Sequence, residues 1–244
     1  MIKNILKSSA RYLGLDVRRY LPSSSAAAQL RTMLAWHKIN LIFDVGANVG
    51  QYVSELRSHV GYRGRIVSFE PMSLAHEVLS KVAVKDELWC VSKRAAIGSR
   101  SGMVTINIAS NSVSSSVLSI LDSHTSAAPE SRYKSTESVP LVTLDSVASD
   151  YFNDGTVALL KIDTQGYESQ VLQGAEKTLA RVAGVQLELS LLPLYDGQML
   201  MPELVEQLTE SGFDLWGISP TFADPTSGRM LQVDATFFRR GGEM

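Results

Sequence analysis

Short apolar runs alternate with helical patterns along most of this chain, and that alternation constrains the fold more than any other feature. Runs of strand length occupy residues 40–45, 65–69, 87–91, 157–162 and 185–189. Helical spacing is found at residues 26–36, 49–59, 73–83 and 167–181. Because the strand runs contain almost no polar alternation, both faces of each strand need to be covered. We therefore expect an α/β fold with a mostly parallel sheet and helices on both faces.

The C-terminal part of the pattern differs from the rest. A helix is expected at 202–211, followed by strands at 213–218 and 231–239. The Pro/Gly/Ser-rich joint between these strands, residues 219–228, is too short for a covering helix. We expect this last pair of strands to be antiparallel.

The middle of the chain is rich in serine, with 13 serines between Ser99 and Ser138. Residues 103–108 and 137–142 alternate and are expected to pair as strands. The stretch between them, 109–136, shows no long helical period, and we interpret it as a mobile surface loop beside the functional site.

Composition excludes several classes of protein. The net charge of −2 over 244 residues argues against a nucleic-acid-binding protein. Cys90 is the only cysteine, which excludes a disulfide framework and a zinc cluster of thiolates. The four histidines have no metal-ligand spacing, so we expect no metal site. The sequence contains no apolar run of membrane-spanning length, and we expect a cytoplasmic protein.

The N-terminus carries its own charge. Residues 1–31 contain six basic side chains and one acidic one, a local charge of +5. Apolar residues interleave with the bases and predict an amphipathic helix up to about Leu15. We divide the chain into a basic helical appendage, residues 1–38, and a domain, residues 39–244. The appendage either covers an acidic face of the domain or contacts an anionic membrane or a partner subunit, which makes peripheral membrane association a second possibility for location.

A glycine-containing turn follows the first expected strand. It comprises Asp44, Gly46, Ala47, Asn48 and Gly50. Glycine permits a sharp turn and a close approach of backbone, and the N–H groups at the following helix favour electron-rich ligands. The Asp44 carboxylate suits a cationic or hydroxyl-bearing ligand. We interpret the turn as a cofactor-binding loop.

Glu70 ends the second strand, 20 residues after Gly50. A carboxylate at this place in a doubly wound sheet can accept hydrogen bonds from both ribose hydroxyls of an adenosine cofactor. Two cofactors compete for the site. Nicotinamide sites usually carry G-x-G-x-x-G, whereas here Asn48 stands in place of the middle glycine. S-adenosylmethionine has no phosphate and needs no bare backbone, so we favour it.

Five ordered motifs resemble the FkbM family of S-adenosylmethionine-dependent methyltransferases. They are Asp44–Gly50, Phe69–Pro71, Thr143–Ser146, Lys161–Glu168 and Val171–Ala175. The resemblance covers about residues 41–239 and includes Glu188. It implies a seven-stranded Rossmann-like sheet with an antiparallel last strand. It also implies O-methylation of a hydroxyl on a sugar, glycolipid or secondary metabolite. Thr164–Gln165 departs from the family pattern, which often has Glu at the second position, and this puts a metal site in doubt.

Candidate catalytic residues come from the strand ends. Asp163 and Glu188 end neighbouring strands and should face the same crevice as Asp44 and Glu70. A carboxylate there can act as general base toward a weakly acidic hydroxyl, and we assign that role to Asp163, which also remains a candidate cofactor ligand. Glu188 would orient the acceptor, and His124 is a third candidate. A nicotinamide-dependent oxidoreductase and a cofactor-binding scaffold without catalysis remain as alternatives.

Overall fold

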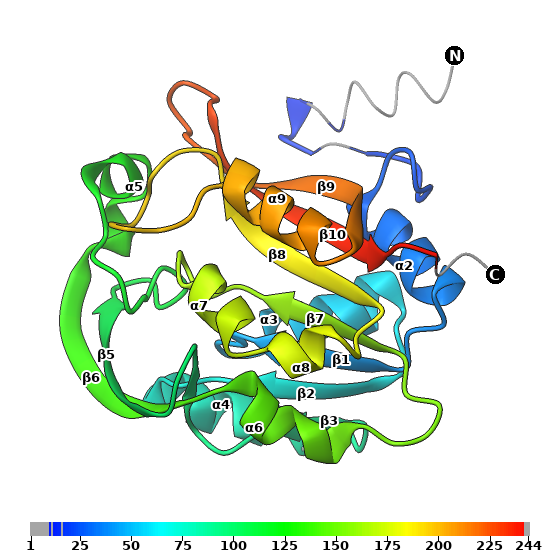
Figure 1. Ribbon diagram of the computed structural model, residues 1–244. Coiled ribbons are helices and arrows are strands. Elements are labelled where there is room, and N and C mark those ends of the chain that lie inside the picture. The colour runs from blue at the N-terminus through cyan, green and yellow to red at the C-terminus, as the bar shows by residue number, and fades with distance from the viewer. Residues whose placement is uncertain (1–9, 11, 16, 242–244) are drawn as a thin grey trace.

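The computed structural model describes residues 10, 12–15 and 17–241, so the helix expected up to about Leu15 lies largely outside the described residues. Its centre is a seven-stranded sheet (Figure 1). In spatial order the strands are β3 (Trp89–Val91), β2 (Arg65–Phe69), β1 (Leu41–Val45), β7 (Ala158–Ile162), β8 (Gly184–Ser190), β10 (Met230–Arg239) and β9 (Phe213–Ala223). The five strands from β3 to β8 are parallel to their neighbours, and β10 is antiparallel to both β8 and β9. This confirms the expected Rossmann-like sheet with an antiparallel last strand.

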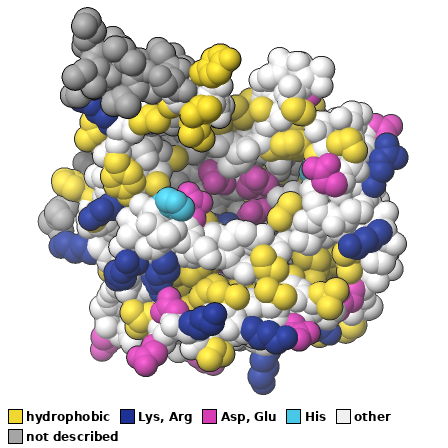
Figure 2. Space-filling view, turned by 180° about the vertical axis from the view of Figure 1, so that it is seen from behind, with side chains coloured by type: hydrophobic (Ala, Val, Ile, Leu, Met, Phe, Trp, Pro, Cys, Tyr) yellow, Lys and Arg dark blue, Asp and Glu magenta, His cyan; other side chains and the backbone are white. Residues whose placement is uncertain are grey.

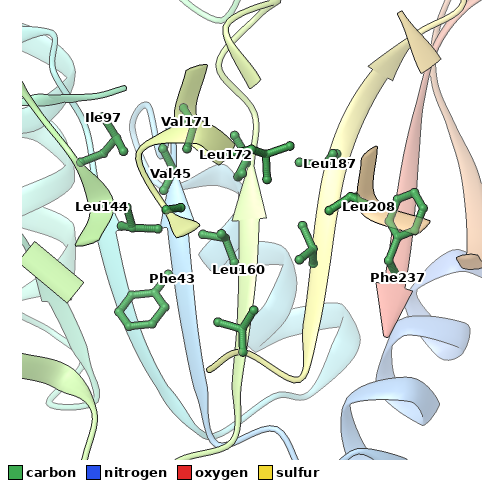
Figure 3. Packing of buried hydrophobic residues seen from close by; sticks show 14 of the residues in the cluster. Phe43, Val45, Ile97, Leu144, Leu160, Val171, Leu172, Leu187, Leu208 and Phe237 are labelled. Atoms are coloured by element: carbon green, nitrogen blue, oxygen red, sulfur yellow. The ribbon is translucent and has the colours of Figure 1, made fainter. Parts of the chain in front are cut away.

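Helices cover both faces of the sheet (Figure 1). One layer contains α6 (Leu144–Ala148), α7 (Glu168–Gln173), α8 (Glu176–Leu179) and α9 (Met201–Glu210). The other contains α2 (Ala26–Trp36), α3 (Gln51–Glu55) with a following π-helical turn (Leu56–Val60), and α4 (Ser73–Ala83). The two core clusters match these layers because successive strand residues point to opposite faces. Phe43 packs with Leu144 and Leu172 on the first side (Figure 3), and Ile42 packs with Leu56 on the second.

Strand β1 is the point at which the order of addition reverses. From β1 the chain adds β2 and β3 on one side, then returns to place β7 and β8 on the other. Ligands of open α/β sheets bind outside the carboxyl ends of the strands at such a switch point. We therefore expect the ligand-binding residues of this fold to follow β1, β2 and β7.

The single helix expected at 167–181 is divided in two. Helix α7 ends at Gln173 and α8 begins at Glu176. A Cβ on Gly174 would lie 1.9 Å from the carbonyl oxygen of Gly98, so only glycine fits where the two backbones meet. The contact joins segments far apart in sequence, which is why helical periodicity alone missed the break.

The middle of the chain forms a second sheet. Its three strands are β4 (Ala96–Ile97), β6 (Tyr133–Val142) and β5 (Gly102–Ala109) in spatial order. The expected pairing of 103–108 with 137–142 is confirmed and antiparallel, whereas β4 was not expected. The segment interpreted as a mobile surface loop, 109–136, contains α5 (Asp122–Ala127) and a 3₁₀ turn (Pro129–Ser131), and it buries Ser116 and Ser131. Strand β9 is longer than expected, because it continues through Ala223 into the segment 219–228 that was expected to be a loop.

The N-terminal part of the described chain joins the domain through α2. Met33 and Leu34 of this helix are buried in the second core cluster. Before α2, the Tyr20 hydroxyl donates to the backbone oxygen of His59 at 2.6 Å. None of the helices within the described part of the chain has the length and apolar character that crossing a bilayer requires. The division of the chain after residue 38 stays a prediction.

Candidate active site

The turn after β1 lies directly against the ends of its two neighbouring strands. The backbone N–H groups of Gly46 and Ala47 both donate to Phe69 O of β2, each at 3.1 Å. Gly46 has a φ of +83°, and a Cβ there would lie 1.8 Å from the backbone oxygen of Asp163 after β7. A side chain at this position would push the two strand ends apart. Gly46 therefore serves close backbone approach, which brings the three strand ends together.

Glu70 is held at the end of β2 by the backbone of two loops. Its Oε2 accepts from Asn48 N at 2.7 Å and its Oε1 from Met72 N at 2.8 Å. Asn48 reaches this position in a left-handed conformation with φ of 47°. Only 2% of Glu70 is exposed, and burial raises its pKa to about 7 despite the two hydrogen bonds. The carboxylate is thus fixed in place and still faces a cavity.

That cavity, of about 220 Å³, opens beside the turn. Of the residues proposed for cofactor binding, Gly46, Ala47, Asn48, Glu70 and Asp163 line it. The other wall comes from the second sheet and its connections, including Ala96, Ile97, Ile106, Ser112, Ser115, Ser116 and Val117. On the face seen in Figure 2 the molecular surface is hollowed, and acidic side chains gather inside the hollow.

Gly50 and Asp44 lie outside this lining. A Cβ on Gly50, whose φ is +94°, would come within 2.6 Å of Cη2 of Trp89. The glycine therefore allows the start of α3 to pack on β3. Asp44 is fully buried on the face covered by α2, α3 and α4, although we expected it to face the crevice.

Asp44 belongs to a buried polar row that crosses three strands. Ser68, Asp44 and Lys161 are register partners on β2, β1 and β7. Ser68 Oγ donates to Asp44 Oδ2 at 3.0 Å, and Lys161 Nζ lies 3.2 Å from Asp44 Oδ1. Lys161 also lies 3.5 Å from Asp163 Oδ2 and 5.0 Å from the centre of the Tyr52 ring. Burial alone would lower the pKa of Lys161, but Asp44 and Asp163 more than offset this and hold it above its ordinary value.

Gln165 is the residue that sequence reasoning missed as a member of the site. Its Nε2 donates to Asp163 Oδ1 at 2.8 Å and to Glu188 Oε2 at 2.6 Å. The expected proximity of Asp163 and Glu188 thus takes the form of two carboxylates sharing one amide. Burial, followed by the charge of Asp163, raises the pKa of Glu188 well above its ordinary value. The departure from the family pattern at 164–165 was the available signal.

His124 lies behind this group and does not line the cavity. It is buried on α5, with its ring 5.2 Å from the ring of Tyr195 and its Nε2 3.5 Å from Ser114 Oγ. Burial lowers its pKa to about 4, which makes it a weak base. Its proposed catalytic role stays a prediction.

The segment between β5 and α5 connects the two sides of the cavity. Asn48 Nδ2 lies 3.3 Å from Ser112 Oγ, and Ser116 Oγ donates to Gln165 O at 2.7 Å. One stretch of chain therefore contacts both the turn after β1 and the loop after β7. Across the part of the chain that the structure describes, no group of three or more His, Cys, Asp or Glu side chains is arranged to hold a metal ion.

A sequence profile of a known methyltransferase family matches the part of the chain that contains this site. The sequence profile described as "Methyltransferase FkbM domain" matches residues 44–215, from the end of β1 into β9. The chain belongs to the FkbM methyltransferase family. The matched region of the FkbM domain includes the turn after β1, Glu70, and the loop after β7 that holds Asp163 and Gln165. A search of curated proteins found no match.

Solved structures show similarity at low sequence identity. The FkbM methyltransferase from Methylobacillus flagellatus KT has 12% identity and a TM-score of 0.46, with 82% of this chain and 43% of that chain covered. An rRNA methylase from Streptococcus thermophilus has 11% identity and a TM-score of 0.45, covering 88% and 96%. Magnesium protoporphyrin IX methyltransferase from Synechocystis PCC 6803 with bound SAM has 9% identity and a TM-score of 0.44, covering 87% and 79%. The matched part of this chain therefore covers less than half of the solved FkbM protein.

Proposed function

We propose that this protein is an S-adenosylmethionine-dependent O-methyltransferase. The observation that carries the proposal is Glu70, a buried carboxylate fixed by Asn48 N and Met72 N at the wall of the cavity beside the Gly46 turn. A carboxylate oxygen has lone pairs beyond the one that each backbone N–H occupies, so Glu70 can still accept from ribose hydroxyls. Glu70 and the Gly46–Asn48 turn would hold the cofactor.

The character of the turn favours this cofactor over a nicotinamide. A pyrophosphate needs bare backbone N–H groups, which glycines supply. Here Asn48 carries a side chain that contacts Ser112, and its own N–H is already given to Glu70. These contacts suit a cofactor with a ribose and no phosphate. A scaffold that binds the cofactor without turnover is the second candidate, because the acceptor is unidentified.

S-adenosylmethionine supplies a sulfonium methyl group for transfer to the acceptor. The protein's own contribution is to place the acceptor oxygen and to take up the hydroxyl proton. Asp163 and Glu188 are the carboxylates available for that proton. Asp163 and Gln165 line the cavity, and the Gln165 amide also donates to Glu188, which lies behind that lining. We infer a small-molecule or glycolipid acceptor with a free hydroxyl, on a sugar, glycolipid or secondary metabolite, and no nucleic acid. Ser112, Ser115 and Ser116 give the opposite wall polar groups that match such an acceptor.

The N-terminal segment supports a peripheral contact with a membrane for a protein that works from the cytoplasm. Its large apolar side chains are exposed: Tyr12, Leu13, Leu15, Val17, Tyr20 and Leu21. Arg18 and Arg19 lie among them and are exposed as well. Apolar and basic side chains side by side are typical of segments that lie on anionic lipid surfaces. Such a contact would bring the cavity close to a glycolipid acceptor.

Thermal melting with separate ligands tests the cofactor. A ligand that binds only the folded protein raises the melting temperature, and we expect this for S-adenosylmethionine and S-adenosylhomocysteine. NADH and NADPH at the same concentration should leave it unchanged. A shift with a nicotinamide alone would overturn the proposal. Cofactor binding combined with no S-adenosylhomocysteine release across a panel of methyl glycosides and glycolipids would favour the scaffold.

A further inference from the structure

The side chain of Gln165 has every hydrogen-bonding group engaged. Its two N–H bonds point to two different carboxylates, Asp163 and Glu188, and its Oε1 accepts from the Tyr195 hydroxyl at 2.7 Å. The backbone of Gln165 is fixed as well, because it has a φ of 55° and its oxygen accepts from Ser116 Oγ. An amide so constrained sets the separation and orientation of the groups it contacts.

The two carboxylates differ in what else they contact. Asp163 Oδ2 faces the ammonium group of Lys161 at 3.5 Å, so adding a proton to Asp163 would forfeit part of that attraction. Glu188 Oε2 accepts from both Gln165 and Gln232, the latter at 2.8 Å. Glu188 therefore has one oxygen held by two amides, and its Oε1 has no donor among the described residues. Glu188 is half-buried beside Gln165, which lines the cavity, and is not itself part of the lining.

We propose that Gln165 is a positioning residue that fixes Glu188, rather than Asp163, as the group that takes the proton of the acceptor hydroxyl. The inference rests on the proposed methyl transfer. In that step the acceptor oxygen forms a bond to the methyl carbon as the carbon–sulfur bond breaks. The bonding pair stays on sulfur, and the hydroxyl proton passes to Glu188 Oε1. Asp163 stays beside Lys161 and takes no part in this proton transfer.

The surroundings of Glu188 decide how it titrates. Its register partner Asp234 on β10, Glu168 on α7 and Asp163 after β7 all face it with negative charge, and each raises its pKa together with burial. The hydrogen bond from Gln165 acts in the opposite direction, since it favours the charged carboxylate. Gln165 thus keeps Glu188 able to ionise within an acidic neighbourhood.

Carbon-13 NMR titration of the full chain labelled at glutamate carboxyl carbons tests the inference. The Glu188 signal is assigned by its loss in Glu188→Gln. In Gln165→Met, which keeps length and β-carbon but removes the amide, we expect the titration midpoint of Glu188 to rise by about one to two pH units. Asp163→Asn should lower it, because a neighbouring negative charge is removed. Gln173→Met, an exposed substitution on α7, is the matched control and should leave it unchanged.

Each result has a defined meaning. An unchanged Glu188 midpoint in Gln165→Met, with S-adenosylhomocysteine still bound, overturns the inference and leaves the proposed function standing. Failure of the wild-type protein to bind S-adenosylhomocysteine overturns the proposed function without affecting the titration. If Gln165→Met does not fold, Tyr195→Phe decides, since it frees the amide by removing only the hydroxyl that holds Oε1. A smaller upward shift in Tyr195→Phe supports the inference, and no shift overturns it.

Discussion

At the scale of single residues, Glu70 shows how a backbone can prepare a carboxylate for a ligand. Asn48 N and Met72 N hold it, and each N–H fixes one oxygen. Glu70→Gln keeps the shape but replaces one acceptor oxygen with an amide group that cannot accept. Hydrogen bonds to charged groups contribute about 1.5–3 kcal/mol, so we expect S-adenosylhomocysteine to bind about 10–100-fold more weakly. Isothermal titration calorimetry measures this, with exposed Glu77→Gln as control. Equal affinity for Glu70→Gln and wild type would contradict the ribose assignment.

The sequence predicts some residues of this site and not others. Glu70 could be placed because a strand end and a following proline locate it on the sheet. Asp44 follows the same logic, yet it is fully buried, pairs with Lys161 and does not line the cavity. The sequence does not reveal this, because the burial of Asp44 depends on Ser68 and Lys161, its register partners on the two neighbouring strands. Gln165 could not be assigned because its partners Glu188 and Tyr195 come from later segments of the chain.

At the scale of elements, the turn after β1 depends on space that only glycine leaves free. Gly46→Ala would add strain at a φ of +83° and place a methyl group 1.8 Å from Asp163 O. Gly197→Ala is a matched control, since Gly197 has a φ of +71° and nothing within 4 Å of the added carbon. The control should cost about 1–2 kcal/mol from strain alone. We expect Gly46→Ala to cost at least about 2 kcal/mol more, measured by urea unfolding. Equal costs would mean that the turn can shift without disturbing β7.

The elements of the main sheet were predictable because buried parallel strands have a strong apolar signature. Expected and observed bounds agree for β2 and α4, and they differ by one residue for β1 and β7. The pairing of β5 with β6 was expected, but β4 and α5 escaped prediction. A two-residue strand has no alternation to detect, and the serine-rich sequence around α5 has weak periodicity. Ser131 and Ser116 are buried there through hydrogen bonds rather than apolar contact. The partner of Ser116, Gln165, lies 49 residues further along the chain, and local sequence periodicity cannot predict such a contact.

At the scale of the whole molecule, buried acids make stability depend on pH. Burial raises the pKa of Glu70, Glu168 and Asp234 to about 7 in each case. The folded protein then holds more protons than the unfolded chain between about pH 4.5 and 7, so the free energy of unfolding falls as pH rises through that window. We expect a lower melting temperature at pH 8 than at pH 6. Glu168→Gln should flatten this dependence, because one titrating group is removed; a melting temperature that rises from pH 6 to pH 8 would contradict the assignment.

Membrane binding through the exposed N-terminal segment is also a property of the whole molecule. Tyr12 and Leu13 are 94% and 73% exposed, and they precede the Arg18–Arg19 pair. Two contributions to the free energy of membrane binding should add: insertion of the apolar side chains and electrostatic attraction of the bases. The second is about 1 kcal/mol for each base near an anionic surface. We expect cosedimentation with phosphatidylserine vesicles that weakens at high salt. Arg18→Glu with Arg19→Glu should weaken the salt dependence, because four of the six bases in residues 1–31 remain. Leu13→Ser with Leu15→Ser should weaken binding at every salt concentration. Because Leu13 and Leu15 are exposed, their substitution should not lower the melting temperature, so sedimentation lost in that variant would report the surface itself. Equal sedimentation of all three proteins would leave the segment without a role at the membrane.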